Sequence, residues 1–387
     1  MAGKTAESSR TERAAHSSGD TKDGSKMSVI DGGEVMASQA TVAEPKEKEK
    51  DKGERESKSV PASELLNKIA GMSSSDRYQI RREISLGGQG TCKVAFDQIT
   101  EREVVLKVSS PGAWNAEHLI KEARYAAKMN HPNVIRVLDV GAFSKDQVFM
   151  AMPYIEGSSL DGIIKKLNEA AIPGLMGYSV TAIAELFDHL CAGVEHAHSM
   201  GVLHLDLKPQ NIIIGSKGEA VVVDFGVAQP VGGGAEPPRR HASHEAPQNT
   251  GLTTTMTGSL SSDPSQRAVG TPAYMSPEQS LGDPGNFTER TDVYGLGGVL
   301  FFLLTGEAPN RIQRPQDLEP YFRHSPVPSP SEFTRRRVPP ELEALCMKCL
   351  SRDPQQRFPT VFHLRHVLKG WLSSPEMWEL YGRSSSF

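Results

Sequence analysis

The sequence predicts an α+β fold in two parts: a small antiparallel sheet with one helix, then a larger and mostly helical region, with a cleft between them. Two observations predict this arrangement. Between residues 78 and 152, short apolar runs with β-branched side chains recur at strand-like lengths. Beyond Gly157, longer segments with the helical spacing of apolar residues dominate, and the chain contains no internal repeat.

The first part is expected to contain five strands and one helix. The helix is predicted at 116–129, where AEHLIKEARYAAKM is rich in strong helix formers, and Pro132 cannot continue it. Three strands are expected before this helix and two after it. Their predicted ranges are 78–86, 92–97, 103–108, 134–140 and 148–152.

The second part is expected to contain four main helices, at 178–200, 292–305, 340–349 and 359–371. Within it, residues 229–268 are rich in Gly, Pro, Ser, Thr and His and have hardly any apolar side chains. A stretch of 40 residues without structure inside a compact domain is uncommon, so we expect a functional or disordered loop there.

The N-terminal region has a different composition. Residues 1–60 contain no Leu, Phe, Tyr or Trp, and 12 of the 15 residues in EPKEKEKDKGERESK (44–58) are charged. Such a segment cannot bury enough apolar surface to offset its chain entropy. We expect a disordered tail over 1–60, a linker over 61–77, a folded domain over 78–372 and a second tail over 373–387.

Composition excludes several classes of protein. The 43 Lys and Arg against 47 Asp and Glu give a net charge of -4, which argues against nucleic acid as a partner. Four cysteines in 387 residues indicate a reducing compartment and no disulfide framework. The N-terminus lacks the apolar core of a signal peptide, and 293–305 is too short to span a bilayer. These features predict a cytoplasmic protein without a membrane anchor.

Two motifs lie in the predicted sheet. LGGQGTCKV (86–94) places glycines between two strands, where backbone N–H groups can approach phosphate oxygens, although a simple hairpin turn is also possible. Lys107 lies in the middle of the apolar run VVLKV (104–108). A lysine there is costly to bury unless a carboxylate meets it, or unless its ammonium reaches water from an edge strand.

Three further motifs follow in the helical part. HLDLKPQN (204–211) brings a carboxylate, an ammonium and an amide into one loop. Asp224 begins DFG, 13 residues after Asn211 and directly behind the apolar run 220–223. Mg²⁺ prefers carboxylates together with phosphate oxygens, so this carboxylate is a candidate metal ligand. The fifth motif is GTPAYMSPE (270–278).

These five motifs occur in a fixed order, and from about residue 78 to 371 the chain resembles a serine/threonine protein kinase. It is most similar to the bacterial kinases that share the eukaryotic catalytic fold. The resemblance implies the two-lobed protein kinase fold, with 78–152 as the N-lobe, 153–157 as the hinge and 158–372 as the C-lobe, and with 229–268 as a long insertion in the activation loop. It also implies ATP and Mg²⁺ as cofactors and proteins with Ser or Thr acceptors as substrates.

The resemblance assigns roles residue by residue. Asp206 would accept the proton of the substrate hydroxyl, Lys208 would reach the transferred phosphoryl group, and Asn211 and Asp224 would hold the metal. Lys107 would hold the α- and β-phosphates and pair with Glu122. The positions expected around the nucleotide are Leu86, Gly87, Gly88, Gln89, Gly90, Thr91, Cys92, Val94, Lys107, Glu122, Met152, Pro153 and Ile155.

Other matched positions are expected to be structural: Glu278 would pair with Arg357, and Asp292 would brace the catalytic loop. His196 and His198 are expected on the surface of their helix. Autophosphorylation is expected in the Ser- and Thr-rich segment 248–266.

The sequence departs from the family pattern at a few positions. Gln89 and Cys92 stand at the second and third glycines of the Gly-rich loop, Pro153 replaces a Glu in the hinge, and Leu205 replaces the Arg that usually precedes the catalytic Asp. The altered loop and Leu205 leave a catalytically weak pseudokinase scaffold as one alternative. A small-molecule kinase is another, against which the peptide-docking segment 270–278 argues. The sequence does not indicate an oligomeric state.

Overall fold

The computed structural model describes residues 69–87, 90–169, 179–232, 270–282, 284–312, 314, 317–334 and 337–376. All of them belong to one compact unit, Val60–Phe387. The expected N-terminal tail, the first part of the expected linker (61–68), most of the loop at 229–268 and most of the C-terminal tail lie outside the described residues.

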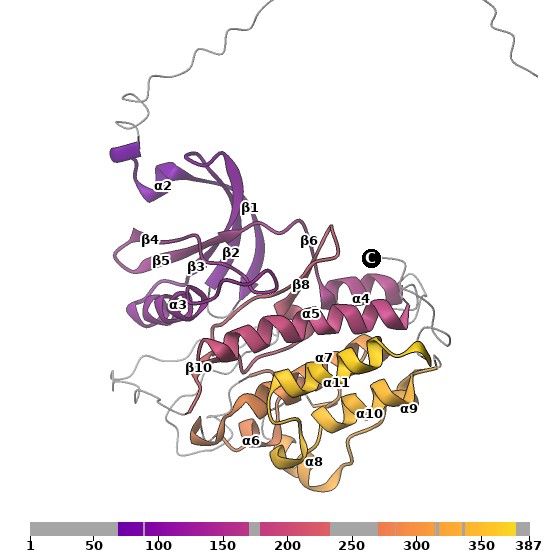
Figure 1. Ribbon diagram of the computed structural model, residues 1–387. Helices are drawn as coiled ribbons and strands as arrows, with labels where there is room; N and C mark the ends of the chain where they lie inside the picture. Colours follow the sequence, from indigo (N-terminus) through magenta and orange to yellow (C-terminus); the bar gives the residue numbers. More distant parts are fainter. Residues whose placement is uncertain are drawn as a thin grey trace, which may run out of the picture. The chain divides into compact units, whose positions relative to one another are not determined.

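The N-terminal part of the described chain is a five-stranded antiparallel sheet with strand order β1-β2-β3-β5-β4 (Figure 1). A four-residue helix, α2 (Ser74–Arg77), precedes it. The strands are β1 (Tyr78–Gly87), β2 (Gly90–Asp97), β3 (Arg102–Ser109), β4 (Asp139–Ser144) and β5 (Gln147–Pro153). Residues that face the core, such as Val104, Leu106 and Phe149, are almost fully buried. Because β3 is the central strand, it is paired on both sides and can hold a side chain at a fixed position.

One helix, α3 (Ala113–Ala126), packs against the sheet through β5 and β3. It begins three residues earlier and ends three residues earlier than the sequence predicts. Its buried face includes Leu119, Ala123 and Ala126, and Glu122 lies on that same face.

The strand predicted at 134–140 forms later in the chain than predicted, as β4. Val134 and Ile135 are buried, but Val134 makes only an isolated bridge to Val222, and the strand β4 begins at Asp139. The apolar residues of this segment are explained by packing against the strand that contains Val222, where the Ile135 N–H donates to the Val222 carbonyl.

The C-terminal part is mostly helical. Its helices are α4 (Leu160–Glu169), α5 (Val180–Ser199), α6 (Pro277–Ser280), α7 (Glu289–Thr305), α8 (Leu318–His324), α9 (Pro330–Phe333), α10 (Pro340–Cys349) and α11 (Val361–Leu372). α7 is buried almost all round and packs against α5, α9, α10 and α11. Gly297 permits the close contact with α10, because a Cβ there would come within 2.6 Å of the Cys349 Cβ. α7 is therefore the central scaffold of this part.

Short strands line the junction between the two parts. A three-stranded sheet has the order β6-β8-β9, formed by β6 (Gly157–Ser159), β8 (Ile212–Gly215) and β9 (Ala220–Val222). β7 (Val202–Leu203) pairs with β10 (Gln229–Pro230), so the first residues of the range expected to be a loop are ordered. The loops that follow β7 and β9 contain the catalytic-loop and DFG motifs. None of the described helices is both long and apolar enough to cross a bilayer.

Candidate active site

Lys107 lies at the centre of the site. On β3 it is opposite Cys92 of β2 and Met150 of β5, so its backbone is fixed on both sides. Its Nζ donates to both carboxylate oxygens of Glu122, at 2.7 and 2.8 Å, and to Oδ1 of Asp224 at 2.9 Å. The ion pair expected between Lys107 and Glu122 is present, and the alternative of a solvated edge-strand lysine is wrong.

The charges of this cluster stabilise one another. Burial works against the ammonium form, but Asp224 and Glu122 outweigh it and raise the pKa of Lys107. Burial likewise works against the charged form of Asp224, but Lys107 outweighs this effect and the pKa falls to about 2. Lys107 and Asp224 are therefore charged at neutral pH. Asp224 itself adopts a left-handed backbone, with φ of 66°, which aims its carboxylate at the lysine.

The catalytic-loop motif forms a second polar cluster. Lys208 Nζ lies 2.6 Å from Oδ2 of Asp206 and 2.7 Å from Oγ1 of Thr271, and the Thr271 hydroxyl donates to Oδ1 of Asp206 at 2.9 Å. The Asn211 amide nitrogen donates to the Asp206 backbone carbonyl at 2.9 Å. All four residues are more than 90% buried. The loop therefore holds a carboxylate, an ammonium and an amide in fixed mutual positions.

The backbone before Asp206 is held by contacts from distant elements. Leu205 adopts a left-handed conformation, with φ of 64°, which costs a side chain with a Cβ about 1–2 kcal/mol. Its N–H donates to Oδ1 of Asp292 on α7, and its carbonyl accepts from the Gln279 side chain at 2.7 Å. The brace expected from Asp292 is present. Gln279 was not singled out in the sequence, because only the fold places α6 beside this loop.

The structure also corrects the placement of His198, which was expected on the helix surface. Only 8% of this residue is exposed, and its Nε2 lies 2.7 Å from Oδ2 of Asp292. His196, two residues earlier, is half-buried and accepts from the Asn130 N–H.

The Gly-rich turn joins β1 and β2, with Gly87 opposite Gly90. Gly90 has to be a glycine, because a Cβ there would come within 2.3 Å of the Val108 carbonyl oxygen. Val94 on β2 is fully buried, whereas Thr91 and Cys92 are partly exposed. Gly88, Gln89 and the side chain of Leu86 lie outside the described residues.

The expected hinge follows directly from β5. Met152 and Pro153 are the last residues of that strand, opposite Val105 and Val104 of β3. Met152 is 9% exposed and packs in the core that also contains Phe225 and Met150, and Ile155 packs against the same core. These residues therefore lie on the chain that connects the sheet to the helical part.

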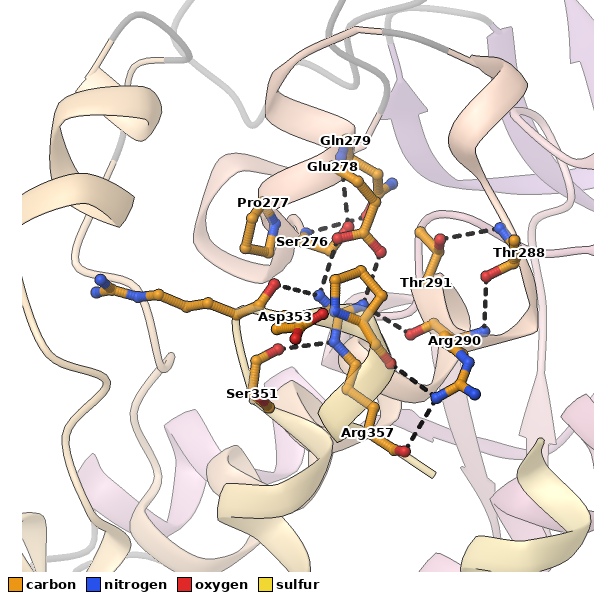
Figure 2. A network of polar contacts seen from close by, with 12 residues as sticks. Ser276, Pro277, Glu278, Gln279, Thr288, Arg290, Thr291, Ser351, Asp353 and Arg357 are labelled. Atoms are coloured by element: carbon orange, nitrogen blue, oxygen red, sulfur yellow. Dashed lines mark hydrogen bonds and ion pairs between the residues drawn. The ribbon is translucent and has the colours of Figure 1, made fainter. Parts of the chain in front are cut away.

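The expected pair between Glu278 and Arg357 is present (Figure 2). The Arg357 guanidinium donates to both carboxylate oxygens of Glu278, at 2.6 and 2.8 Å. It also donates to the carbonyls of Ser351, Arg290 and Arg352. This network fixes α6, which follows the segment containing Thr271.

The donor chemistry of this site suits a nucleotide with a hard cation. Asp224 keeps 41% of its side chain exposed, although Lys107 contacts one oxygen. The Asn211 amide nitrogen donates to Asp206, so the amide oxygen is the atom that could bind a metal ion. Carboxylate and amide oxygens are ligands of Mg²⁺, and an ammonium beside them suits phosphate.

Two features of the molecule define its class: an antiparallel sheet whose central strand holds a lysine, and a buried loop with a carboxylate, an ammonium and an amide. A family model described as the protein kinase domain matches residues 78–368, and the chain belongs to this family.

Similar proteins of known name come from bacteria. The chain is 35% identical over 313 residues to a protein of Chlamydia pneumoniae named serine/threonine-protein kinase PknD, an alignment that covers 79% of this chain and 32% of the relative. The protein of the same name from Chlamydia muridarum is also 35% identical, over 78% of this chain and 32% of the relative. The chain thus spans about a third of the length of these curated relatives.

Proposed function

We propose that this protein is an active serine/threonine kinase that transfers the γ-phosphoryl group of ATP to Ser and Thr hydroxyls of proteins. One observation supports this most strongly: the Lys107–Glu122–Asp224 cluster and the Asp206–Lys208–Thr271–Asn211 cluster are both assembled in one structure. A pseudokinase would be expected to lack at least one of these contacts. The names of the relatives support the same activity.

Each side chain has a role in phosphoryl transfer. Asp206 accepts one bond at Oδ1 and two at Oδ2, which leaves capacity to accept the proton of a substrate hydroxyl. Lys208 is placed to offset negative charge that develops on the transferred group, and Lys107 to hold the α- and β-phosphates. Mg²⁺, held by Asp224 and Asn211, would neutralise phosphate charge.

Preference for Ser and Thr over Tyr is supported by the contacts of Thr271. Its hydroxyl links Asp206 and Lys208, so the segment 270–278 is joined directly to the catalytic carboxylate. We infer proteins as the substrates because this segment resembles the peptide-docking segment of the family. The cytoplasm as its location is inferred from composition.

Phosphoryl transfer from labelled ATP tests the proposal. Asp206→Asn keeps the size of the side chain but removes the proton acceptor, and we expect kcat on a Ser/Thr protein substrate to fall by at least about a hundredfold. Asp317→Asn, at an exposed ion pair on the surface, is the matched control and should retain full activity. Phosphopeptide mapping of the wild type should place autophosphorylation within 248–266.

Three outcomes would contradict the proposal in different ways. No transfer by the wild type to any protein, together with retained ATP binding, would indicate a pseudokinase. Transfer to small molecules but not to proteins would indicate a small-molecule kinase. Equal activity of wild type and Asp206→Asn would show that another group accepts the proton.

Leu205 predicts weak control by phosphorylation of the activation loop. Its side chain is 3% exposed and packs with Leu203, Val227 and Phe287, so this position is apolar and has no donor for a phosphate. Replacing every Ser and Thr between residues 250 and 265 with Ala is expected to lower kcat/KM on a peptide by less than about tenfold, or about 1.4 kcal/mol. A loss of a hundredfold or more, restored by phosphorylating the wild-type loop, would show that another basic group reads the phosphate.

A further inference from the structure

We propose that His198 is a positioning residue: as an imidazolium held between Glu289 and Asp292, it fixes the Asp292 carboxylate that in turn holds the backbone leading to the catalytic Asp206. The inference rests on the proposed kinase function for its kinetic consequences. The structural role of His198 is argued from the geometry of four residues, namely His198, Glu289, Asp292 and Leu205.

Asp292 holds the backbone of the catalytic loop through a buried carboxylate. Its carboxylate is 1% exposed and accepts two backbone bonds, from the His204 N–H at Oδ2 and from the Leu205 N–H at Oδ1, both at 2.8 Å. Both bonds are stronger to an ionised carboxylate, because hydrogen bonds to a charged acceptor are stronger than those to a neutral one. A buried carboxylate is stable only when a positive charge or several donors compensate it.

Within the described part of the chain, the ion pair of Asp292 is made with His198, whose Nε2 is 2.7 Å from Oδ2. The other ring nitrogen, Nδ1, lies 3.6 Å from Oε2 of Glu289, one turn earlier on α7. That is an ion-pair distance, and Nδ1 has no hydrogen-bond partner among the described residues. A neutral ring that donates to Asp292 would direct a lone pair at the Glu289 carboxylate, whereas an imidazolium directs an N–H there.

The charge balance agrees with this geometry. The titratable groups that face His198 are Glu289 and Asp292 of α7. Of the other elements that pack against α5, β7 and β9 are apolar, and the Arg365 and Lys369 side chains of α11 pair instead with Asp188 and Glu195 of α5. Burial disfavours the imidazolium, but the two carboxylates outweigh it and raise the pKa of His198 to about 9. For Asp292, burial works against ionisation, but His198 outweighs it and lowers the pKa. Ring and carboxylate are therefore both charged at neutral pH.

The positioning matters because of Leu205. Its left-handed backbone is strained, and it persists only if its neighbours fix it. Among the described residues, the bond to Asp292 is one of two hydrogen bonds that hold the Leu205 backbone, and Asp206 is the next residue. A less firmly held Asp292 is therefore expected to increase the motion of Asp206, which lowers kcat and leaves ATP and peptide binding intact.

The test compares the wild type with His198→Gln, which can still donate a bond but has no charge, and with His366→Gln, an exposed control on α11. For His198→Gln we expect kcat to fall about tenfold, with both KM values within about twofold of wild type. Hydrogen exchange of the His204 and Leu205 amides should be about tenfold faster. His366→Gln should change none of these quantities.

The pH profile adds a readout that a merely structural role would not move. The folded pKa is raised above the unfolded value of 6.5, so the contribution of the charged ring is complete below about pH 6.5 and is lost as the pH rises through about 9. Wild-type kcat should show an alkaline limb near pH 9 that His198→Gln lacks. Glu289→Gln should move this limb to lower pH, by about half a unit to one unit.

Two results would overturn the proposal: amide exchange at His204 and Leu205 that is unchanged in His198→Gln, or a neutral His198 ring at pH 7 in the NMR spectrum of the wild type. Both measurements need no phosphoryl transfer. An inactive wild type would therefore refute the kinase function, while amide exchange and ring charge would still decide the role of His198.

Discussion

Replacing Lys107 with Met is expected to lower kcat by at least about a hundredfold while the protein remains folded. The ammonium is bonded to Glu122 and Asp224 at 2.7–2.9 Å, so it is fixed at the point where phosphates would lie beside the candidate metal ligand. Methionine has a similar length and is apolar, so it preserves the packing of β3 but cannot hold phosphate. Labelled ATP and a protein substrate measure the loss of transfer, and circular dichroism measures folding.

The design separates loss of phosphate binding from loss of structure. Removing the ammonium leaves Glu122 buried beside Asp224, but a carboxyl group can take up a proton and so avoid an uncompensated charge. The protein should therefore unfold at a urea concentration close to that of the wild type. Lys369→Met, at an exposed position on α11, is the control and should be fully active. If Lys107→Met retains more than about a tenth of the wild-type kcat, the assignment of Lys107 is wrong.

The features that could be predicted from the sequence are those that depend on residues close together in the chain. The apolar strand around Lys107 and the helical composition before His131 each need only local periodicity, and both elements form at nearly the predicted places. The catalytic loop was also identifiable, because its carboxylate, ammonium and amide are separated by only a few residues. In the structure these groups contact one another.

The features missed depend on contacts between distant segments. The sequence predicts His198 to be a surface residue. Its burial could not be predicted, because it depends on Asp292 of α7, which lies 94 residues later in the chain. Gln279 gave no signal, since its role is a bond to a backbone carbonyl 74 residues away. The error at 134–140 has the same cause: a short apolar run with β-branched residues predicts a strand, but its first residues pack beside Val222 without joining the sheet ladder.

The largest effect on stability is expected at Arg357. Its side chain is fully buried, and its guanidinium makes five hydrogen bonds, two of them to the Glu278 carboxylate. Removing one partner of such a pair leaves the other charge buried without compensation, which typically costs about 3–5 kcal/mol. Arg357→Met should therefore lower the free energy of unfolding by about that amount, measured by urea denaturation.

A pair of further variants shows whether the cost comes from the unpaired carboxylate or from lost packing. Arg314→Met removes an arginine whose ion pair with Asp317 is exposed, and it should cost less than about 1 kcal/mol. Adding Glu278→Gln to Arg357→Met removes the uncompensated charge, so the double variant should be less destabilised than the sum of the single variants, by about 1–3 kcal/mol. Strict additivity would mean that the two side chains act independently. In that case the chain carbonyls of Ser351, Arg290 and Arg352, and not Glu278, would be the partners that make Arg357 indispensable.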